Sequence, residues 1–408
     1  MRILIATTHR NFVGGVEKYL QAIIPALVIR GHEIALVFEN SFDPSMETID
    51  PPELNLVAWC LRESGPQSIL QSLAAWKPDL VFSNGLEAAH FQTALLDSYP
   101  TVLYAHNYLG TCATGQKCHA FPTPRPCTRQ FGPACMVLHY PRRCGGLNPL
   151  TMWKMFERSA EMNRHLPKYE AVLVASRHMR DEFRKHGVPE DRAHLVSLPN
   201  RPIDGLSHVR TAPNGRLLFI GRLTKLKGVS HMLRAIPIAA QKLGRSLTLT
   251  IAGDGPERES LQASARELGV AANFIGWIEG SQITGLMQDS DLLAVPSLWP
   301  EPFGLVGIEA GARGLPAVAY RVGGIPDWLS AGESGELAPG DPPTVEGLAD
   351  AIHRALADPG HYARLSRGAF EVAGRFTLER HVSRLEEIFR AVPRRPIHAI
   401  LPAESIHA

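Results

Sequence analysis

Short runs of apolar residues recur along this chain and alternate with longer segments whose apolar residues have helical spacing. Unbroken apolar runs are typical of strands buried on both faces, so we expect strands at residues 2–7, 33–38, 80–83, 101–105 and 171–175. Residues 16–30 have the spacing of an amphipathic helix, and further helices are expected between the later strands. This alternation predicts an α/β fold with a doubly wound parallel sheet.

The alternation starts again at residue 217 and continues to about residue 374. Residues 195–213, between the two series, are rich in proline and turn residues and have no periodicity, so the domain boundary falls there. We expect one Rossmann-like domain at 1–200 and a second at 201–375, facing each other across a cleft. A closing helix at 376–393 and a tail at 394–408 complete the prediction.

Two glutamates in the run DLLAVPSLWPEPFGLVGIEAGARGLP lie where a parallel sheet binds its ligands. A buried strand followed by a helix at 303–312 puts Glu301 on the loop between them and Glu309 two turns into the helix. The free amides near Gly304 and Leu305, together with the helix dipole, favour an anion. The segment predicts an anion site flanked by two carboxylates that bind hydroxyl groups. The alternative is a solvated loop glutamate beside a surface helix glutamate.

A strand at 217–220 runs into the loop GRLTKLKG, and a helix is expected at 229–240. Strand, glycine turn, basic loop and helix form a phosphate-binding layout, although the G-K-[ST] ending of the nucleoside triphosphatase loop is missing. Arg222 offers a planar fork for phosphate oxygens and Lys227 a point charge. Charge-assisted hydrogen bonds are worth about 1.5–3 kcal/mol each, so two of them together with helix amides are enough to hold a diphosphate. Solvated basic residues on a turn are the alternative.

Five motifs in this order resemble the family 4 retaining glycosyltransferases, which have the glycosyltransferase-B fold. They are GRLTKLKG, IAGDGPE, FIGWI, EPFGLVGIEA and GGIPD, all in the second half of the chain, and MRILIATTHRNFVGGVEKYL is similar to the opening of the same family. The resemblance covers nearly the whole chain apart from residues 112–148 and the tail. Asp327 stands where glutamate is commoner in the family, and GARGLP replaces a more usual alanine–methionine–alanine run.

The resemblance implies transfer of a glycosyl unit from a nucleoside diphosphate sugar to an acceptor hydroxyl, with the anomeric configuration retained. Arg222 and Lys227 would stabilise the departing diphosphate, Glu309 would bind the ribose hydroxyls, and Glu301 would hold the transferred sugar. Two basic side chains can take the place of a metal, so no cofactor is expected. The run Asp289-Ser290-Asp291 resembles a metal-binding pair but enters its strand at the amino end, away from ligands. The closing helix would pack back onto the first domain.

The first domain is expected to contribute glycines and a histidine to the cleft. Gly14 and Gly15 follow the first strand, where a close backbone approach to phosphate or substrate favours residues without a Cβ; an ordinary turn is the alternative. His106 follows the strand TVLYA and, by resemblance, contacts the transferred sugar, although a histidine at this position can also be structural. Ser176, after AVLVA, is expected first as a helix N-cap.

Composition agrees with a soluble two-domain protein. The chain has 408 residues, 45% hydrophobic and 20% charged, with a net charge of +2, which argues against nucleic acid as an obligatory partner. No apolar run approaches the ~20 residues of a membrane helix. The amino terminus has no signal-peptide core, so a cytoplasmic location is expected, with membrane association at the inner face as a hypothesis.

Residues 112–148 form an insert that the resemblance does not explain. It contains Cys112, Cys118, Cys127, Cys135 and Cys144. No acidic residue occurs between Asp97 and Glu157, whereas Lys117, Arg125, Arg129, Arg142, Arg143 and Lys154 are basic. We expect this insert to contact an anionic acceptor, or an anionic membrane that carries a lipid-linked one; a solvated loop is the alternative. The cysteines are also candidate zinc ligands, although no C-x-x-C spacing occurs.

The predicted function is therefore a retaining glycosyltransferase whose partners are a sugar nucleotide and a saccharide or lipid-linked acceptor. Cell-envelope, exopolysaccharide or glycoconjugate assembly is an expectation at the level of the family. Two alternatives share the donor site: a nucleotide-sugar epimerase, which needs no acceptor, and a non-catalytic nucleotide-sugar-binding protein.

Overall fold

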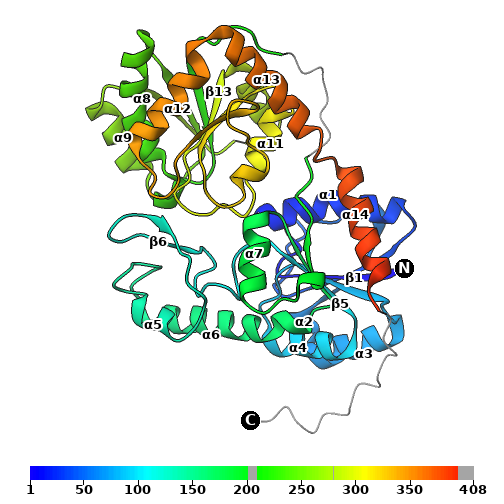
Figure 1. Ribbon diagram of the computed structural model, residues 1–408. Helices are drawn as coiled ribbons and strands as arrows, with labels where there is room; N and C mark the ends of the chain where they lie inside the picture. Colours follow the sequence, from blue (N-terminus) through cyan, green and yellow to red (C-terminus); the bar gives the residue numbers. More distant parts are fainter. Residues whose placement is uncertain (201–208, 279, 394–408) are drawn as a thin grey trace.

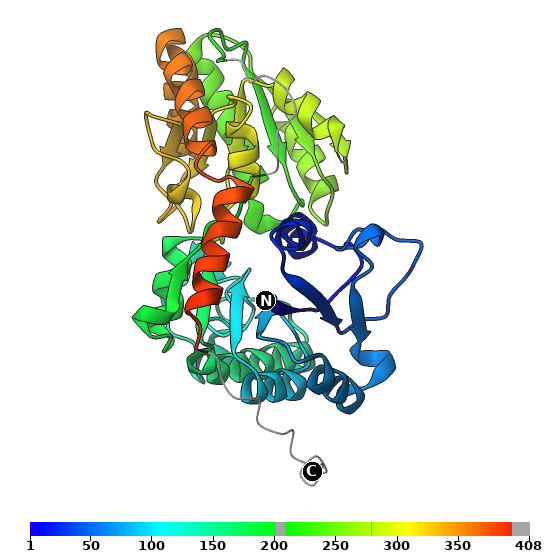
Figure 2. The ribbon, with the colours of Figure 1, turned by 90° about the vertical axis from the view of Figure 1, so that its right-hand side faces the viewer.

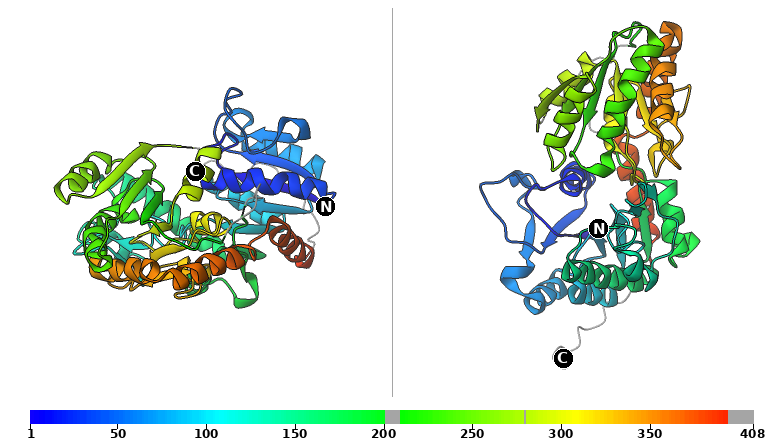
Figure 3. Two further views of the ribbon diagram at one scale, coloured as in Figure 1. Left: turned by 90° about the horizontal axis from the view of Figure 1, so that it is seen from above. Right: turned by 90° about the vertical axis from the view of Figure 1, so that its left-hand side faces the viewer.

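The computed structural model describes residues 1–200, 209–278 and 280–393, which form two lobes, one above the other (Figure 1 and the right-hand view of Figure 3). The predicted tail at 394–408 and residues 201–208 of the predicted boundary lie outside the described residues. Each lobe is built on one parallel sheet, the first with strands from residues 2–195 and the second with strands from residues 216–338.

The first sheet has seven parallel strands in the order β3-β2-β1-β4-β5-β8-β9. Their bounds are β1 Arg2–Thr7, β2 Glu33–Phe38, β3 Val57–Cys60, β4 Leu80–Ser83, β5 Thr101–Ala105, β8 Ala171–Val174 and β9 Ala193–Leu195. The helices of this lobe are α1 Gly15–Ile29, α2 Leu61–Ser64, α3 Pro66–Trp76, α4 Ala89–Ser98, α5 Ala134–Leu138, α6 Pro149–His165 and α7 Arg177–Lys185. A short antiparallel hairpin in the insert pairs β6 (Cys118–His119) with β7 (Arg125–Pro126). All five strands predicted from the apolar runs are present, and β8 ends at Val174.

Strand β1 shows why these strands read as continuous apolar runs. Successive side chains point to opposite faces of a sheet, and helices cover both faces here. Ile3 and Ile5 face one cluster, which includes apolar side chains of α1. Leu4 and Ala6 face the other cluster, formed with α3 and α4. Because both faces are buried, no polar position interrupts the run.

The second sheet has six parallel strands in the order β12-β11-β10-β13-β14-β15. Their bounds are β10 Arg216–Ile220, β11 Thr248–Ala252, β12 Ala271–Gly276, β13 Leu292–Val295, β14 Ala317–Tyr320 and β15 Gly335–Ala338. The helices around it are α8 Val229–Leu243, α9 Arg258–Glu267, α10 Ser281–Asp289, α11 Leu305–Gly311, α12 Val345–Ala357 and α13 Pro359–Ala373.

The helix predicted over residues 303–312 is shorter than expected, because α11 begins only at Leu305. The carbonyl of Phe303 accepts a hydrogen bond from Trp328 Nε1 at 2.6 Å rather than from an amide of the helix. Glu309 therefore lies in the second turn of α11, not two turns into the helix as predicted.

A last helix, α14 (Leu378–Ala391), leaves the second lobe and runs down the first (Figures 1 and 2). Its apolar residues, Val382, Leu385, Ile388 and Phe389, join the same cluster as Ile3 and α1. The ring of Phe389 lies 5.1 Å from that of Phe82 in β4. The first lobe thus completes its core with residues from the end of the described chain. None of the described helices is long and apolar enough to cross a membrane.

We expect Phe389→Ala to destabilise the protein by about 3–5 kcal/mol, because it leaves a cavity in a closed core. Phe389 is 1% exposed, whereas Phe370 on α13 is 44% exposed, so Phe370→Ala is the matched control and should cost far less. Urea unfolding measures both changes. Equal losses in the two variants would show that α14 does not complete the core of the first lobe.

Candidate active site at the domain interface

Glu301 lies on the loop after β13, and its buried carboxylate is the centre of a hydrogen-bond network. The side chain is 7% exposed, and its Oε1 atom accepts from three donors. These are Lys227 Nζ at 2.6 Å, Ser297 Oγ at 2.5 Å and Trp299 Nε1 at 2.9 Å. A carboxylate taken out of water needs such partners. None of the described residues donates a hydrogen bond to its second oxygen, Oε2, so that atom is the one available to a ligand.

The structure brings Lys227 and Glu301 together as an ion pair, although the sequence analysis assigned them to different parts of the donor, the diphosphate and the transferred sugar. Lys227 ends a short 3-10 turn, Lys225–Lys227, before α8, and its Nζ also lies 5.5 Å from the centre of the Trp299 ring. Its side chain is 29% exposed, so one side of it still faces solvent. A phosphate could approach from that side while Glu301 keeps the lysine in place.

Two glycine motifs hold the Glu301 loop by close backbone contact. Gly228, at the end of GRLTKLKG, has φ +70°, and a Cβ there would lie 1.9 Å from the carbonyl oxygen of Pro296. Gly323, in GGIPD, has φ +54°, and a Cβ there would lie 2.4 Å from the carbonyl oxygen of Glu301. The next residue, Gly324, donates its amide to that same oxygen at 2.7 Å. Both motifs therefore fix the backbone that presents Glu301.

Arg222 follows β10 on the loop that ends with Lys227. Its side chain is exposed and makes no hydrogen bond or ion pair with the described part of the chain. The structure therefore does not bring Arg222 into contact with the Lys227–Glu301 pair. Arg222 is free to take an anionic ligand, and its predicted contact with a diphosphate stays a prediction.

Glu309 points toward the first domain rather than toward Glu301. Its Oε1 lies 3.5 Å from Nζ of Lys18 on α1, and both side chains are partly exposed. Gly304 is the N-cap of α11, and Leu305 is the first residue of the helix, so their amides precede the first intrahelical partners. The predicted ligand contacts of these three residues stay predictions.

His106 lies at the carboxyl end of β5, in a pocket of about 230 Å³ on the first domain. The pocket is lined by the ends of β1, β4 and β5, the start of α1 and the second half of α6. His106 Nε2 lies 3.0 Å from Oδ1 of Asn84, which follows β4. Because an amide oxygen only accepts, Nε2 carries the proton and Nδ1 is left as an acceptor for a hydroxyl.

The ring of His106 packs against aromatic rings that keep it neutral. Its centre lies 4.7 Å from that of Tyr104 and 5.1 Å from that of Tyr19. Burial, and then the nearby His381, lower the pKa of His106 from 6.5 to about 3. The imidazole is therefore uncharged near neutral pH and can exchange hydrogen bonds with hydroxyl groups without carrying a charge.

Gly14 and Gly15 lie between β1 and α1, close to the pocket. Gly14 donates its amide to the carboxylate of Glu17, a pocket residue, at 2.8 Å. A Cβ at Gly14 would meet no atom closer than 3.7 Å, and one at Gly15 would meet none within 4 Å. Packing within the protein does not explain either glycine, so a close approach to a ligand stays the prediction for both.

The two halves of the site meet through contacts between the domains. Ser176 caps α7, as predicted, by accepting from the Met179 amide. A Cβ at Gly324 would lie 2.7 Å from Cβ of Ser176, so the second domain's glycine motif abuts this cap. The next residue, Arg177, pairs with Asp327 at 2.5 Å.

Tyr108, two positions after His106, is buried. Burial first, and then the charges of Glu182, Glu301 and Asp327, raise its pKa. The charge of Glu301 thus reaches the loop that carries His106, although the two residues belong to different domains.

Two family models match this chain, one in each domain. Residues 13–199 match the family model described as Glycosyltransferase Family 4, and residues 209–372 match the one described as Glycosyl transferases group 1. Together the two matches include His106, Lys227, Glu301 and every strand of the two parallel sheets except β1. The chain belongs to the family 4 glycosyltransferases.

Similar proteins are glycosyltransferases as well. Glycogen synthase of Mycobacterium tuberculosis is 27% identical over 416 residues, 90% of this chain and 89% of that protein. D-inositol 3-phosphate glycosyltransferase of Saccharomonospora viridis is 38% identical over 185 residues, 43% of this chain and 42% of that protein. The structure of Anabaena HepE in complex with UDP-glucose superposes with a TM-score of 0.67, covering 96% of this chain and 100% of that chain at 19% identity. The predicted glycosyltransferase-B fold is confirmed.

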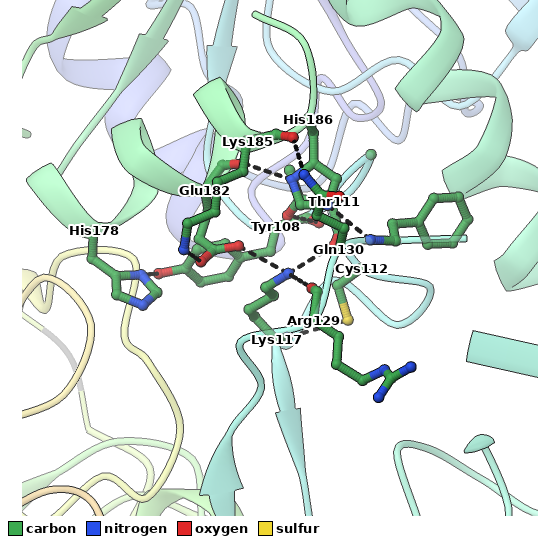
Figure 4. A network of polar contacts seen from close by, with 12 residues as sticks. Tyr108, Thr111, Cys112, Lys117, Arg129, Gln130, His178, Glu182, Lys185 and His186 are labelled. Atoms are coloured by element: carbon green, nitrogen blue, oxygen red, sulfur yellow. Dashed lines mark hydrogen bonds and ion pairs between the residues drawn. The ribbon is translucent and has the colours of Figure 1, made fainter. Parts of the chain in front are cut away.

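The insert of this family 4 glycosyltransferase is anchored to α7 by a buried ion pair (Figure 4). Lys117 and Glu182 are 1% and 4% exposed, and their Nζ and Oε2 atoms lie 2.9 Å apart. Lys117 Nζ also donates to the carbonyls of Thr111 at 3.2 Å and Arg129 at 2.5 Å. Burial opposes the ionisation of Glu182, but hydrogen bonds from Lys185 and Lys117 outweigh it and lower its pKa. Lys117 is therefore a structural residue, not part of the positive field predicted for the insert.

The insert also touches the second domain beside the Glu301 loop. Cys118 Sγ lies 3.8 Å from the carbonyl oxygen of Leu298, and Arg125 pairs with Asp341 at 2.9 Å. In Figure 1 the hairpin of β6 and β7 accordingly reaches up toward the upper lobe.

The cysteines of the insert are free thiols. Within the described residues, no group of three or more histidine, cysteine, aspartate or glutamate side chains could hold a metal ion, so the zinc alternative for Cys112, Cys118, Cys127, Cys135 and Cys144 has no support. Burial raises the pKa of Cys118 to about 12 and that of Cys144 to about 11. Because metals bind the thiolate rather than the thiol, this environment disfavours a site.

Asp291, in the D-x-D run, has a structural role. Its side chain is 4% exposed and pairs with Arg216 at 3.1 Å. It also accepts the backbone amides of Asn214 and Arg216 at 3.0 and 2.8 Å. These contacts join the amino ends of β13 and β10, away from the site.

Sequence reasoning missed four residues of the site: Lys18, Asn84, Ser297 and Trp299. Asn84 could have been found, because it follows a predicted strand just as His106 does. Ser297 and Trp299 lie in the same motif as Glu301, but which donors reach one carboxylate oxygen depends on how the loop folds. Lys18 pairs with Glu309 across the domain interface, so no local pattern could have indicated that contact.

We expect acidification below about pH 6.5 to lower the free energy of unfolding, partly through His106. Its lowered pKa of about 3 means that the unfolded chain binds a proton that the folded chain does not, so stability falls as the pH falls toward that value. His106→Gln should make the slope of unfolding free energy against pH shallower in urea titrations. His90→Gln, which replaces an exposed histidine, is the control. Equal slopes in wild type and His106→Gln would contradict the prediction.

Proposed function

We propose that this family 4 glycosyltransferase transfers a sugar from a nucleoside diphosphate sugar to the hydroxyl of a saccharide or lipid-linked acceptor, with retention of configuration. The observation that carries the proposal is the Lys227–Glu301 pair at the carboxyl end of β13, 2.6 Å apart, at the domain interface. It puts a cation for the leaving diphosphate directly beside a carboxylate for the sugar hydroxyls. Cell-envelope, exopolysaccharide or glycoconjugate assembly is the proposed setting.

Each charged group has a role that follows from its surroundings. Lys227 and the exposed Arg222 offset the charge that develops on the diphosphate as the glycosidic bond breaks. Glu301 Oε2 accepts a hydroxyl of the transferred sugar, while Oε1 is occupied by its three donors. Glu309 binds the ribose hydroxyls, exchanging its contact with Lys18 for the nucleoside.

The acceptor is proposed to bind in the His106 pocket. The neutral imidazole of His106, at the edge shared with the donor, can hydrogen-bond a hydroxyl of the transferred sugar without attracting the diphosphate. Attack occurs on the same face as the departing diphosphate, whose oxygen takes the acceptor's proton. The acceptor oxygen forms the new bond to the anomeric carbon, and the diphosphate leaves with the bonding electron pair, so Glu301 is not a nucleophile. The two basic side chains replace a metal, and no cofactor is required.

Nucleotide binding tests the donor site. We expect one of UDP, GDP and ADP to stabilise the protein against heat, by roughly 2.7 kcal/mol at 100 times its dissociation constant. Arg222→Ala should weaken binding on the order of 10- to 100-fold, since one charge-assisted bond is lost. Lys225→Ala removes an exposed charge of the same loop and is the matched control. No shift with any nucleotide, in folded protein, would count against the donor site.

Product analysis tests the reaction itself. With the stabilising nucleotide's sugar donors and a panel of saccharide acceptors, we expect an acceptor-dependent product whose anomeric configuration, read by NMR, matches that of the donor. Glu301→Gln should lower kcat by roughly 100-fold or more, because the carboxylate is part of the preorganised site. An altered sugar nucleotide formed from donor alone would instead identify an epimerase. Binding without any turnover would favour a non-catalytic protein.

A further inference from the structure

The insert and the helix that follows it expose an unusual group of large apolar side chains. Val137 is 76% exposed, Leu147 76%, Leu150 74%, Trp153 53% and Tyr140 37%. We call these five residues the insert surface. They come from α5, the turn after it and the first turns of α6, which lie at the same corner of the first lobe (Figure 1). Of the fourteen large apolar side chains that are exposed among the described residues, five fall within 137–153, a concentration that singly scattered apolar residues do not give.

The backbone beneath the insert surface is held in place by hydrogen bonds. His139, itself 2% exposed, donates from Nε2 to the carbonyl of Gly146 at 2.9 Å. The amide of Cys144 donates to the carbonyl of His139 at 3.0 Å. Asn148 caps α6 by accepting the amide of Leu150 at 2.9 Å. These bonds close the turn, so Leu147 and Leu150 are presented to solvent by ordered backbone.

The charged residues of the insert and of the first turns of α6 are all basic up to Glu157, which lies one turn beyond Trp153. No acidic residue occurs between Asp97 and Glu157. Among the basic residues there, Lys117 is paired with Glu182 and Arg125 with Asp341. The remaining basic side chains form no ion pair with the described residues; they are Arg129, Arg142, Arg143 and Lys154.

The apolar and basic groups meet at the tip of the insert. The Arg143 guanidinium lies 5.3 Å from the centre of the Phe121 ring, and Phe121 is itself 48% exposed. The carbonyl of Arg142 accepts the amides of Ala120 and Phe121 at 3.0 and 3.1 Å. The arginines are thereby tied to the hairpin turn, at the margin of the exposed apolar residues.

We propose that the insert surface docks on a membrane interface that contains anionic lipid headgroups. Tryptophan, tyrosine and leucine side chains partition into the boundary between headgroups and acyl chains, and arginine and lysine bind anionic headgroups beside them. A protein partner would also cover apolar side chains, but four nearby basic side chains without an ion pair to the described residues are complementary to an anionic plane. The docking stands independently of the transfer reaction.

The purpose of the docking does rest on the proposed function. The helix α6 that presents Leu150 and Trp153 in its first turns also lines the His106 pocket with Arg158 and Glu161. At about 1.5 Å of rise per residue, Leu150 and Arg158 are roughly 12 Å apart along the helix. A docked protein therefore holds the pocket close to the headgroups, where the saccharide of a lipid-linked acceptor would lie.

Sedimentation of the full chain with vesicles tests the docking. We expect binding to phosphatidylcholine vesicles that contain about one-third phosphatidylglycerol, and much weaker binding to phosphatidylcholine alone. Arg142→Ser with Arg143→Ser should weaken binding on the order of 30-fold, since each basic residue contributes a factor of about 5. Leu150→Ser with Trp153→Ser, both on exposed positions, should also weaken it by at least about tenfold.

Matched controls separate docking from folding and from general charge. Arg375→Ser with Arg380→Ser removes the same charge from exposed positions near α14 and should leave binding unchanged. Nucleotide-induced thermal shifts on the same samples should be unchanged in every variant. The proposal is overturned by wild type that does not sediment, by insert variants that bind as wild type does, or by an equal loss in the control pair. The proposal is also overturned if this surface mediates self-association. In that case wild type without vesicles has the mass of an oligomer, and Leu150→Ser with Trp153→Ser lowers that mass. Absence of docking with nucleotide binding and turnover intact would leave the proposed function standing.

Discussion

A buried carboxylate must be supplied with hydrogen bonds, and the loops of the second domain are arranged to supply them to Glu301. Lys227, Ser297 and Trp299 reach one oxygen, which leaves the other for a ligand. The loop can adopt this shape only because Gly228 and Gly323 allow two further segments to touch its backbone. Three sequence motifs that are far apart along the chain therefore depend on one another through a single side chain.

The same requirement explains how the insert is attached. Lys117 is almost fully buried, so its charge must be matched by Glu182 and its remaining protons by the carbonyls of Thr111 and Arg129. This network ties the insert to α7, whose N-cap, Ser176, abuts the second domain at Gly324. The insert is consequently part of the domain interface rather than an appendage, and its exposed side presents apolar and basic residues to the surroundings.

The two domains contribute different chemistry to the site. The first provides a neutral histidine in a pocket at the strand ends, and the second provides an ion pair and an exposed arginine. Helix α14 crosses back to fill the core of the first domain, and the Arg177–Asp327 and Lys18–Glu309 pairs connect the domains beside the site. The proposed donor has separate phosphate, ribose and sugar parts. It would suit a site in which one domain supplies charged groups and the other a neutral histidine.

Apolar runs and their spacing were enough to predict the two parallel sheets, because strands buried on both faces must be apolar throughout. Motif order was enough to predict the family, and the predicted strands correctly placed His106 directly after β5 and Glu301 on the loop after β13. The sequence could not indicate that Lys227 pairs with Glu301, that Glu309 faces Lys18, or that Lys117 is neutralised inside the protein. Those outcomes depend on which groups are buried together, and burial is set by contacts between segments that are distant along the chain.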